Sequence, residues 1–221
     1  METKPDKTRR AIRGLFLAFS LAVLAFFEFF YLFGFLDGTC YAFCVTFYNL
    51  PCYVFSVGMF LLGLTSLVAW LPRHTWLTSA FLSIYFAVTF LASLCWARWV
   101  PLLSLTALLS SVLALGLSEW RAPAFKEAAE RLSFGLAFSA FVFIAGWNVM
   151  FCFGSSSKLP PCALVALGLL SVPLRIKRPR YSPLPLLAYF VLGGLTTGFH
   201  GLELLGVLAS TMAFIFNRLD D

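Results

Sequence analysis

The stretch from Gly14 to Leu36 reads GLFLAFSLAVLAFFEFFYLFGFL. It contains one ionisable residue, Glu28, and exceeds the length of about 20 apolar residues that a helix needs to cross the hydrocarbon core of a bilayer. The run is too long for the apolar part of a cleavable signal peptide, and no small-residue cleavage motif precedes Asp37. We therefore predict that this segment is a retained transmembrane helix.

The composition of the whole chain supports the same class. Of its 221 residues, 61% are hydrophobic and 12% are charged, whereas soluble domains contain about 45–50% apolar and about 25% charged residues. Such a chain has too few polar side chains to cover a surface in water. The sequence therefore predicts an all-α integral membrane protein, a polytopic helical bundle that faces lipid.

Eight apolar segments are candidate transmembrane helices. They are Gly14–Leu36, Pro51–Leu71, Trp76–Trp96, Trp99–Leu117, Leu132–Phe153, Pro161–Leu174, Pro183–Phe199 and Leu202–Phe216. Because the sixth and the last are short, the expected number of spans is eight, within a range of six to eight.

The basic residues indicate the orientation of these spans. With eight spans, all of the 16 lysines and arginines except Arg98 and Lys158 fall on one side of the membrane. The positive-inside rule makes that side cytoplasmic, so both termini are expected there. The basic clusters then act mainly as orientation signals, with some contact to anionic lipid headgroups. Nucleic acid is not expected as a partner, because no aromatic residues alternate with the charges.

Short matches in the same order suggest that the two halves of the chain are related. Leu17–Ser20 recurs as Leu136–Ser139, and Tyr85-Phe86 recurs as Tyr189-Phe190. Pro51-Cys52 followed by Gly58 also recurs, as Pro161-Cys162 followed by Gly168. These matches predict two tandem four-helix membrane units, at residues 1–117 and 132–221. A cytoplasmic linker at 118–131, which suits a short surface helix, would join them.

All six cysteines are predicted on the outer side. They are Cys40, Cys44, Cys52, Cys95, Cys152 and Cys162. Because the outer compartment is oxidising, disulfide bonds are expected there. Cys152 and Cys162 flank the short loop Gly154–Ser157, so we predict that they pair. By correspondence, Cys52 would pair with Cys40 or Cys44, which leaves the other for Cys95.

The cysteines also allow a second interpretation, a membrane thiol–disulfide oxidoreductase that passes electrons to quinone. In this respect the chain resembles the vitamin K epoxide reductases and their bacterial relatives, which are four-helix membrane enzymes with extra cysteines in an outer loop. Their working pair is a Cys-x-x-Cys at the end of a span. The corresponding stretch here is Cys95-Trp96-Ala97-Arg98, with arginine in the second cysteine position. The sequence therefore favours structural disulfides.

Polar residues within apolar segments are candidates for function, because they are costly to place in a membrane. Glu28 is expected to face the inside of the bundle and to be protonated or to contact a polar group from another span. Its counterpart in the second half is Trp147, beside Asn148. Near the outer surface, Arg98 could meet Glu203, which shares a helix face with His200. The simplest role for these three residues is an interfacial ion pair.

The chain contains no Gly-x-Ser-x-Gly, Walker or His-Glu-x-x-His motif, and its spacing of histidines and acids predicts no metal site. A non-catalytic accessory or structural membrane protein is therefore favoured over an enzyme. It would lie in the lipid bilayer beside a protein partner and carry no cofactor. Quinone enters only with the oxidoreductase. A third interpretation is a small-solute carrier with Glu28 as its proton or gate site.

Overall fold

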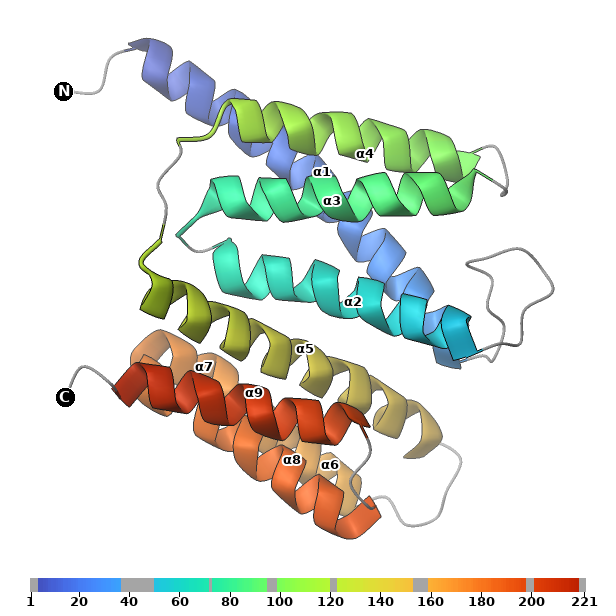
Figure 1. The fold of residues 1–221 in the computed structure, drawn as a ribbon, viewed down its shortest axis with the longest axis vertical. Coiled ribbons are helices and arrows are strands. Elements are labelled where there is room, and N and C mark those ends of the chain that lie inside the picture. The colour runs from blue at the N-terminus through green and yellow to red at the C-terminus, as the bar shows by residue number, and fades with distance from the viewer. Residues whose placement is uncertain are drawn as a thin grey trace. The chain divides into compact units, whose positions relative to one another are not determined.

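The computed structural model describes the backbone of residues 4–36, 50–71, 73–94, 99–119, 123–152, 159–197 and 201–218. Within these ranges the chain is helical and contains no strand (Figure 1). The helices are α1 (Lys4–Leu36), α2 (Leu50–Trp70), α3 (Thr75–Ser93), α4 (Trp99–Gly116), α5 (Phe125–Cys152), α6 (Leu159–Leu169), α7 (Ser171–Lys177), η1 (Pro179–Tyr181), α8 (Pro183–Thr197) and α9 (Gly201–Arg218). The all-α class is confirmed, and within the described residues each apolar segment predicted from the sequence is mainly helical.

Three helices in the described part of the chain are long and apolar enough to cross a membrane. They contain the segments Lys7–Phe29, Thr75–Ser93 and Phe125–Gly146. Two further helical segments, Phe55–Trp70 and Val100–Gly116, are also apolar but are shorter. Membrane localisation is therefore compatible with the fold on grounds of length and composition.

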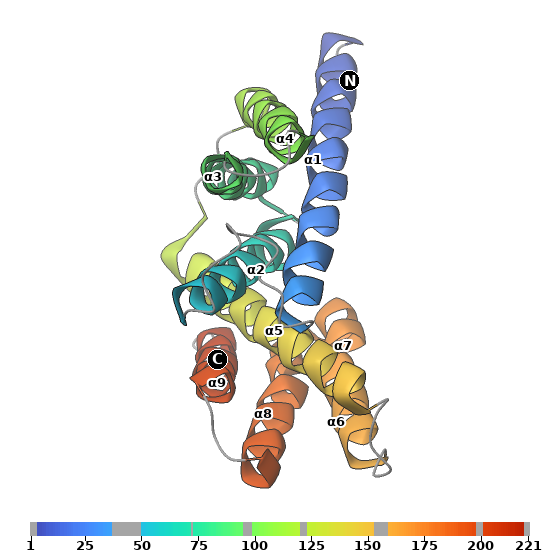
Figure 2. The same ribbon diagram turned by 90° about the vertical axis from the view of Figure 1, so that its right-hand side faces the viewer.

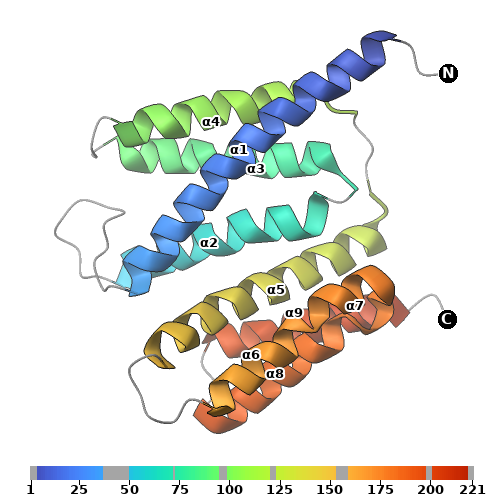
Figure 3. The same cartoon turned by 180° about the vertical axis from the view of Figure 1, so that it is seen from behind.

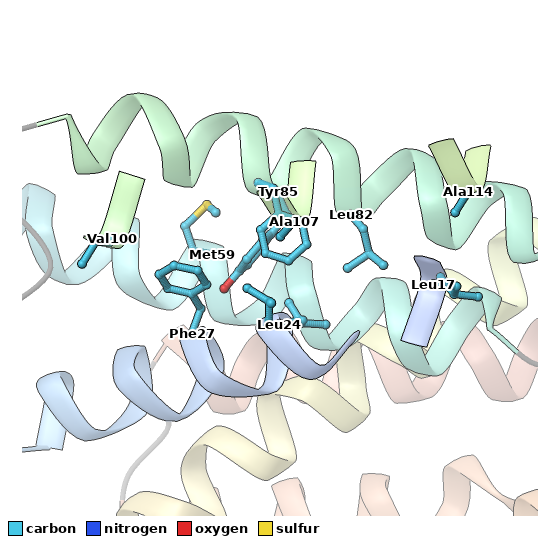
Figure 4. Close-up of a cluster of buried hydrophobic side chains, with 11 residues drawn as sticks. Leu17, Leu24, Phe27, Met59, Leu82, Tyr85, Val100, Ala107 and Ala114 are labelled. Atoms are coloured by element: carbon cyan, nitrogen blue, oxygen red, sulfur yellow. The ribbon is translucent and has the colours of Figure 1, made fainter. Parts of the chain in front are cut away.

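The chain divides into two compact units, Met1–Ala122 and Pro123–Asp221. In the first, α1 packs against α2 and α4, and α3 packs against the same two helices. The long α1 crosses α4 obliquely and ends beside α2 (Figure 3), while its N-terminal turns extend past its neighbours (Figure 2). The core of this unit combines large side chains on α1 and α3 with small ones on α4, including Ala107 and Ala114 (Figure 4).

Serine hydroxyls connect α4 to both of its neighbours. Ser110 donates to the Phe16 carbonyl of α1 at 3.0 Å, and Ser83 of α3 donates to Ser111 at 3.0 Å. Ser20 of α1 also lies 3.4 Å from the Ala107 carbonyl. Small residues let helix backbones approach closely, and hydroxyl groups that bond across helices are typical of packing in membranes.

The second unit has a corresponding set of contacts. α5 packs against α6 and α9, and α8 packs against the same two helices. Small buried residues line α9, as they line α4: Gly206, Ala209, Ser210 and Ala213 repeat the spacing of Ala107, Ser110, Ser111 and Ala114. One sequence match does not carry over, because Gly58 is exposed whereas Gly168 packs against the Phe141 ring.

Two helix boundaries differ from the predicted spans. α5 begins at Phe125, so half of the predicted linker is the first part of this helix, and the described residues of the linker form no separate surface helix. The cause is the run from Lys126 to Arg131, which is rich in alanine and glutamate and has no helix breaker. The segment predicted as the sixth span forms α6 and the start of α7, which continues to Lys177. Pro173 has no N–H for the Leu169 carbonyl, and the two helices divide there.

Candidate functional site

Glu28 lies inside the first unit, where α1, α2 and α3 meet. Its side chain is 9% exposed and lies one turn after Leu24, a core residue on the same face of α1. The carboxyl group lies directly against the backbone of Gly63 on α2. A Cβ atom at position 63 would lie 3.0 Å from Glu28 Cδ and 2.9 Å from Leu24 Cδ1. Only glycine leaves room there for the carboxyl group.

Tyr85 of α3 supplies the polar group that faces this carboxyl. Its side chain is fully buried, and its hydroxyl points toward α1 between Leu24 and Phe27 (Figure 4). The burial of Glu28 agrees with the predicted inward orientation, and its contact with a polar group from another helix stays a prediction. Within the described part of the chain, neither carboxyl oxygen of Glu28 accepts a hydrogen bond. Both oxygens are therefore unoccupied by a donor, and either could carry a proton.

A related arrangement occupies the second unit. The Tyr189 hydroxyl on α8 faces the Asn148 amide on α5, and Glu203 at the start of α9 is near enough to interact with it electrostatically. Tyr189 is 3% exposed, and its ring packs edge-on against Phe141 with centroids 4.8 Å apart. Each unit therefore directs the tyrosine of its matched Tyr-Phe pair toward a polar residue on its first helix.

The strongest polar cluster lies at the other end of the second unit, and sequence reasoning missed it. The two terminal guanidinium nitrogens of Arg175 on α7 donate to the Glu130 carboxylate on α5, Nη2 at 3.1 Å. Asn217 near the end of α9 donates to the same carboxylate at 3.3 Å. The guanidinium also lies over the Phe134 ring, 4.5 Å from its centroid. The signal in the sequence, two opposite charges, gave no indication that they meet.

Several predicted site residues fall outside the described part of the chain. Arg98 and His200 are among them, so their proposed meeting with Glu203 stays a prediction. Three cysteines, Cys40, Cys44 and Cys95, also fall there. For Cys52, Cys152 and Cys162 the structure describes only the helical backbone. The disulfide pairings therefore stay predictions. Among the described residues, no group of three or more His, Cys, Asp or Glu side chains could hold a metal ion.

Comparison of the chain with protein families, curated proteins and solved structures gives no match. The functional argument therefore depends on the polar groups described above and on the distribution of apolar side chains.

Proposed function

We propose that the chain is a multi-pass integral membrane protein with eight spans and with both termini in the cytoplasm. The observation that supports this most is the number of large apolar side chains on the surface of the described helices. Buried positions combine an apolar core with many hydroxyl groups, and further large apolar side chains are exposed. Examples of more than half-exposed side chains are Leu15, Leu91, Leu102, Leu109, Leu195 and Leu208. Lipid tails are the solvent that such a surface requires.

Two measurements test this proposal. Extraction of cell membranes with alkaline carbonate should leave the chain in the pellet, and release into the supernatant would contradict membrane insertion. Reporter fusions after Glu119 and after Asp221 should both give cytoplasmic signals, because an even number of spans precedes each position. Signals on opposite sides of the membrane would mean that the span count is wrong.

Within the membrane, we propose an accessory or structural role, in which the chain holds a protein partner and its outer loops carry disulfides. The supporting observation is that several polar side chains of this chain bond to other helices of the same unit. The Glu130–Arg175 pair and the serine contacts join helices to one another, as scaffolding requires. Mass-spectrometric mapping of thiols on native membranes separates this role from a thiol–disulfide oxidoreductase. Cysteines that are fully oxidised whatever the state of the quinone pool support the structural role, and a quinone-dependent mixture supports the enzyme.

The Glu28 site favours a second candidate, a small-solute carrier in which this carboxyl binds and releases a proton. The supporting observation is a carboxyl group that is buried against Gly63 and Tyr85 without a fully formed hydrogen bond. Buried ionisable residues in membrane helices commonly serve proton transfer. A purely structural Glu28 would need only hydrogen-bonding capacity, which an amide also supplies.

Proton flux into vesicles distinguishes the two candidates. The purified chain is reconstituted in vesicles containing a pH-sensitive dye, and flux is driven by a potassium diffusion potential. A carrier gives flux that Glu28→Gln abolishes, while the control variant Glu119→Gln, at an exposed carboxyl group, retains it. A structural protein gives no flux above that of empty vesicles, and the Glu28→Gln variant unfolds at the same denaturant concentration as the parent chain.

A further inference from the structure

The segment from α7 through η1 places exposed cations beside exposed apolar side chains. Arg175 is held by Glu130, but Lys177, Arg178 and Arg180 are exposed. Ile176 beside them is 80% exposed, and Tyr181 is 44% exposed. We call these five residues, Ile176, Lys177, Arg178, Arg180 and Tyr181, the basic platform. The combination is informative, because the charged groups favour water whereas the exposed Ile176 side chain favours an apolar environment.

The platform is a firmly built turn. Arg178 N–H bonds to the Leu174 carbonyl at 2.7 Å, and Tyr181 N–H bonds to the Arg178 carbonyl at 3.0 Å. The Pro179 carbonyl accepts from both the backbone N–H and the hydroxyl of Ser182, at 3.1 and 2.8 Å. The Glu130–Arg175 pair then fixes α7 to α5. The cations therefore have a defined position at one end of the second unit.

Apolar side chains continue from the platform along one side of α6 and α7. Leu169 at the end of α6 is 51% exposed, and Val172 and Ile176 on α7 are 42% and 80% exposed. The spacing of four residues puts Val172 and Ile176 on one face of α7. This stripe leads directly to the cations at the end of α7. An apolar stripe that ends in basic residues, with a tyrosine beside them, matches the change from lipid tails to headgroups.

We propose that the basic platform binds the anionic headgroups of phospholipids in the cytoplasmic leaflet. Lys177 and Arg178 would contact the phosphates, Ile176 would lie among the upper acyl chains, and the Tyr181 ring would lie at their boundary. The inference rests on the proposed membrane insertion and goes beyond it, because an orientation signal alone needs no defined site. Lipid fits better than a soluble anion, because the apolar stripe continues from the charges into the lipid-facing surface.

Spin-labelled lipids test the platform in the full-length chain. The purified protein is reconstituted in phosphatidylcholine vesicles that contain spin-labelled phosphatidylglycerol or, in parallel, spin-labelled phosphatidylcholine. Electron paramagnetic resonance then gives the immobilised fraction of each, and their ratio measures the preference for the anionic lipid. Each basic residue near a membrane surface changes anionic-lipid binding by about fivefold. The triple variant Lys177→Gln, Arg178→Gln, Arg180→Gln should therefore lose most of the preference.

The matched control is Lys7→Gln, Arg9→Gln, Arg10→Gln, which removes the same charge from exposed turns of α1. It should retain most of the preference, and equal losses in the two triple variants would overturn the proposal. The single variant Arg178→Gln, with an expected loss of about fivefold, covers the case in which the platform triple inserts wrongly. Displacement of the labelled lipid by millimolar inorganic phosphate would indicate a soluble-anion site and would also overturn it. Release of the chain from membranes by alkaline carbonate, by contrast, would contradict membrane insertion itself.

Discussion

Gly63 and Gly58 lie on the same helix, α2, and provide a matched pair of substitutions at the Glu28 site. At Gly58 an added Cβ atom meets nothing within 4 Å. At Gly63 it meets the Glu28 carboxyl and the Leu24 side chain, at 3.0 Å from Glu28 Cδ and 2.9 Å from Leu24 Cδ1. We therefore predict that Gly63→Ala destabilises the first unit and that Gly58→Ala does not.

The size of the effect follows from two contributions. Replacing glycine by alanine within a helix stabilises it by about 0.5–1 kcal/mol, and this gain applies to both positions. At Gly63 the carboxyl must either overlap the new methyl group or rotate away from Tyr85, and overpacking of this kind costs about 1–3 kcal/mol. Because the helix contribution cancels between the variants, Gly63→Ala should be less stable than Gly58→Ala by about 1–3 kcal/mol.

Unfolding of the purified protein in mixed micelles, induced by dodecyl sulfate and followed by tryptophan fluorescence, measures this difference. The double variant Glu28→Ala, Gly63→Ala provides the internal test, because removal of the carboxyl group makes room for the methyl group. The cost of Gly63→Ala should therefore shrink in the Glu28→Ala background, which a double-mutant cycle detects. Equal stabilities for Gly63→Ala and Gly58→Ala, or strict additivity in the cycle, would refute the packing argument.

Two further predictions concern the second unit. Arg175→Gln should destabilise it by about 1–3 kcal/mol, because the Glu130 carboxylate loses two charge-assisted bonds while its side chain is only 12% exposed. The control Arg178→Gln removes the same charge at an exposed position of the same segment and should cost less than about 0.5 kcal/mol. Comparable losses in the same unfolding assay would contradict a special role for the Glu130–Arg175 pair. Gly206→Ala would press a methyl group into a fully buried ring of α8, so it should cost at least about 1 kcal/mol more than Gly193→Ala, where the added atom has open space. Unfolding midpoints that agree for these two glycine variants would rule that out.

The helical class and the positions of the helices were accessible from sequence, because apolar run length depends only on local composition. The helix ends differ from the ends of the apolar segments for other reasons. The start of α5 was placed too late because Lys126, Glu127, Glu130 and Arg131 are charged, and an apolar scan stops at charge although the helix does not. The sixth segment was predicted to end near Leu174, although helix continues to Lys177.

The two polar sites differ in how far sequence could reach them. The inward orientation of Glu28 followed from the cost of exposing a carboxyl group to lipid, which needs no knowledge of its neighbours. The contact between Glu28 and Gly63 could not be predicted in this way, since any of several small residues on other helices could have lain against the carboxyl group. The Glu130–Arg175 pair joins residues separated by 45 positions, and Arg175 belonged to a cluster that the positive-inside rule already explained. Because the positive-inside rule already accounted for Arg175, there was no reason in the sequence to look for an acidic partner such as Glu130.

The comparison of Tyr85 with Tyr189 bears on the choice between a scaffold and a carrier. Each tyrosine is buried on the matched helix of its unit, and each faces a polar residue on the first helix, Glu28 in one unit and Asn148 in the other. A neutral carboxyl and an amide offer similar hydrogen bonds, but only the carboxyl can bind and release a proton. If both sites serve only to hold a tyrosine, an amide is sufficient for this role, because Asn148 faces Tyr189 in the second unit. Glu28→Gln would place an amide at the corresponding site of the first unit. That substitution should then change the free energy of unfolding by less than about 0.5 kcal/mol. An unchanged stability combined with abolished proton flux would instead show that the first unit keeps its carboxyl group for proton transfer.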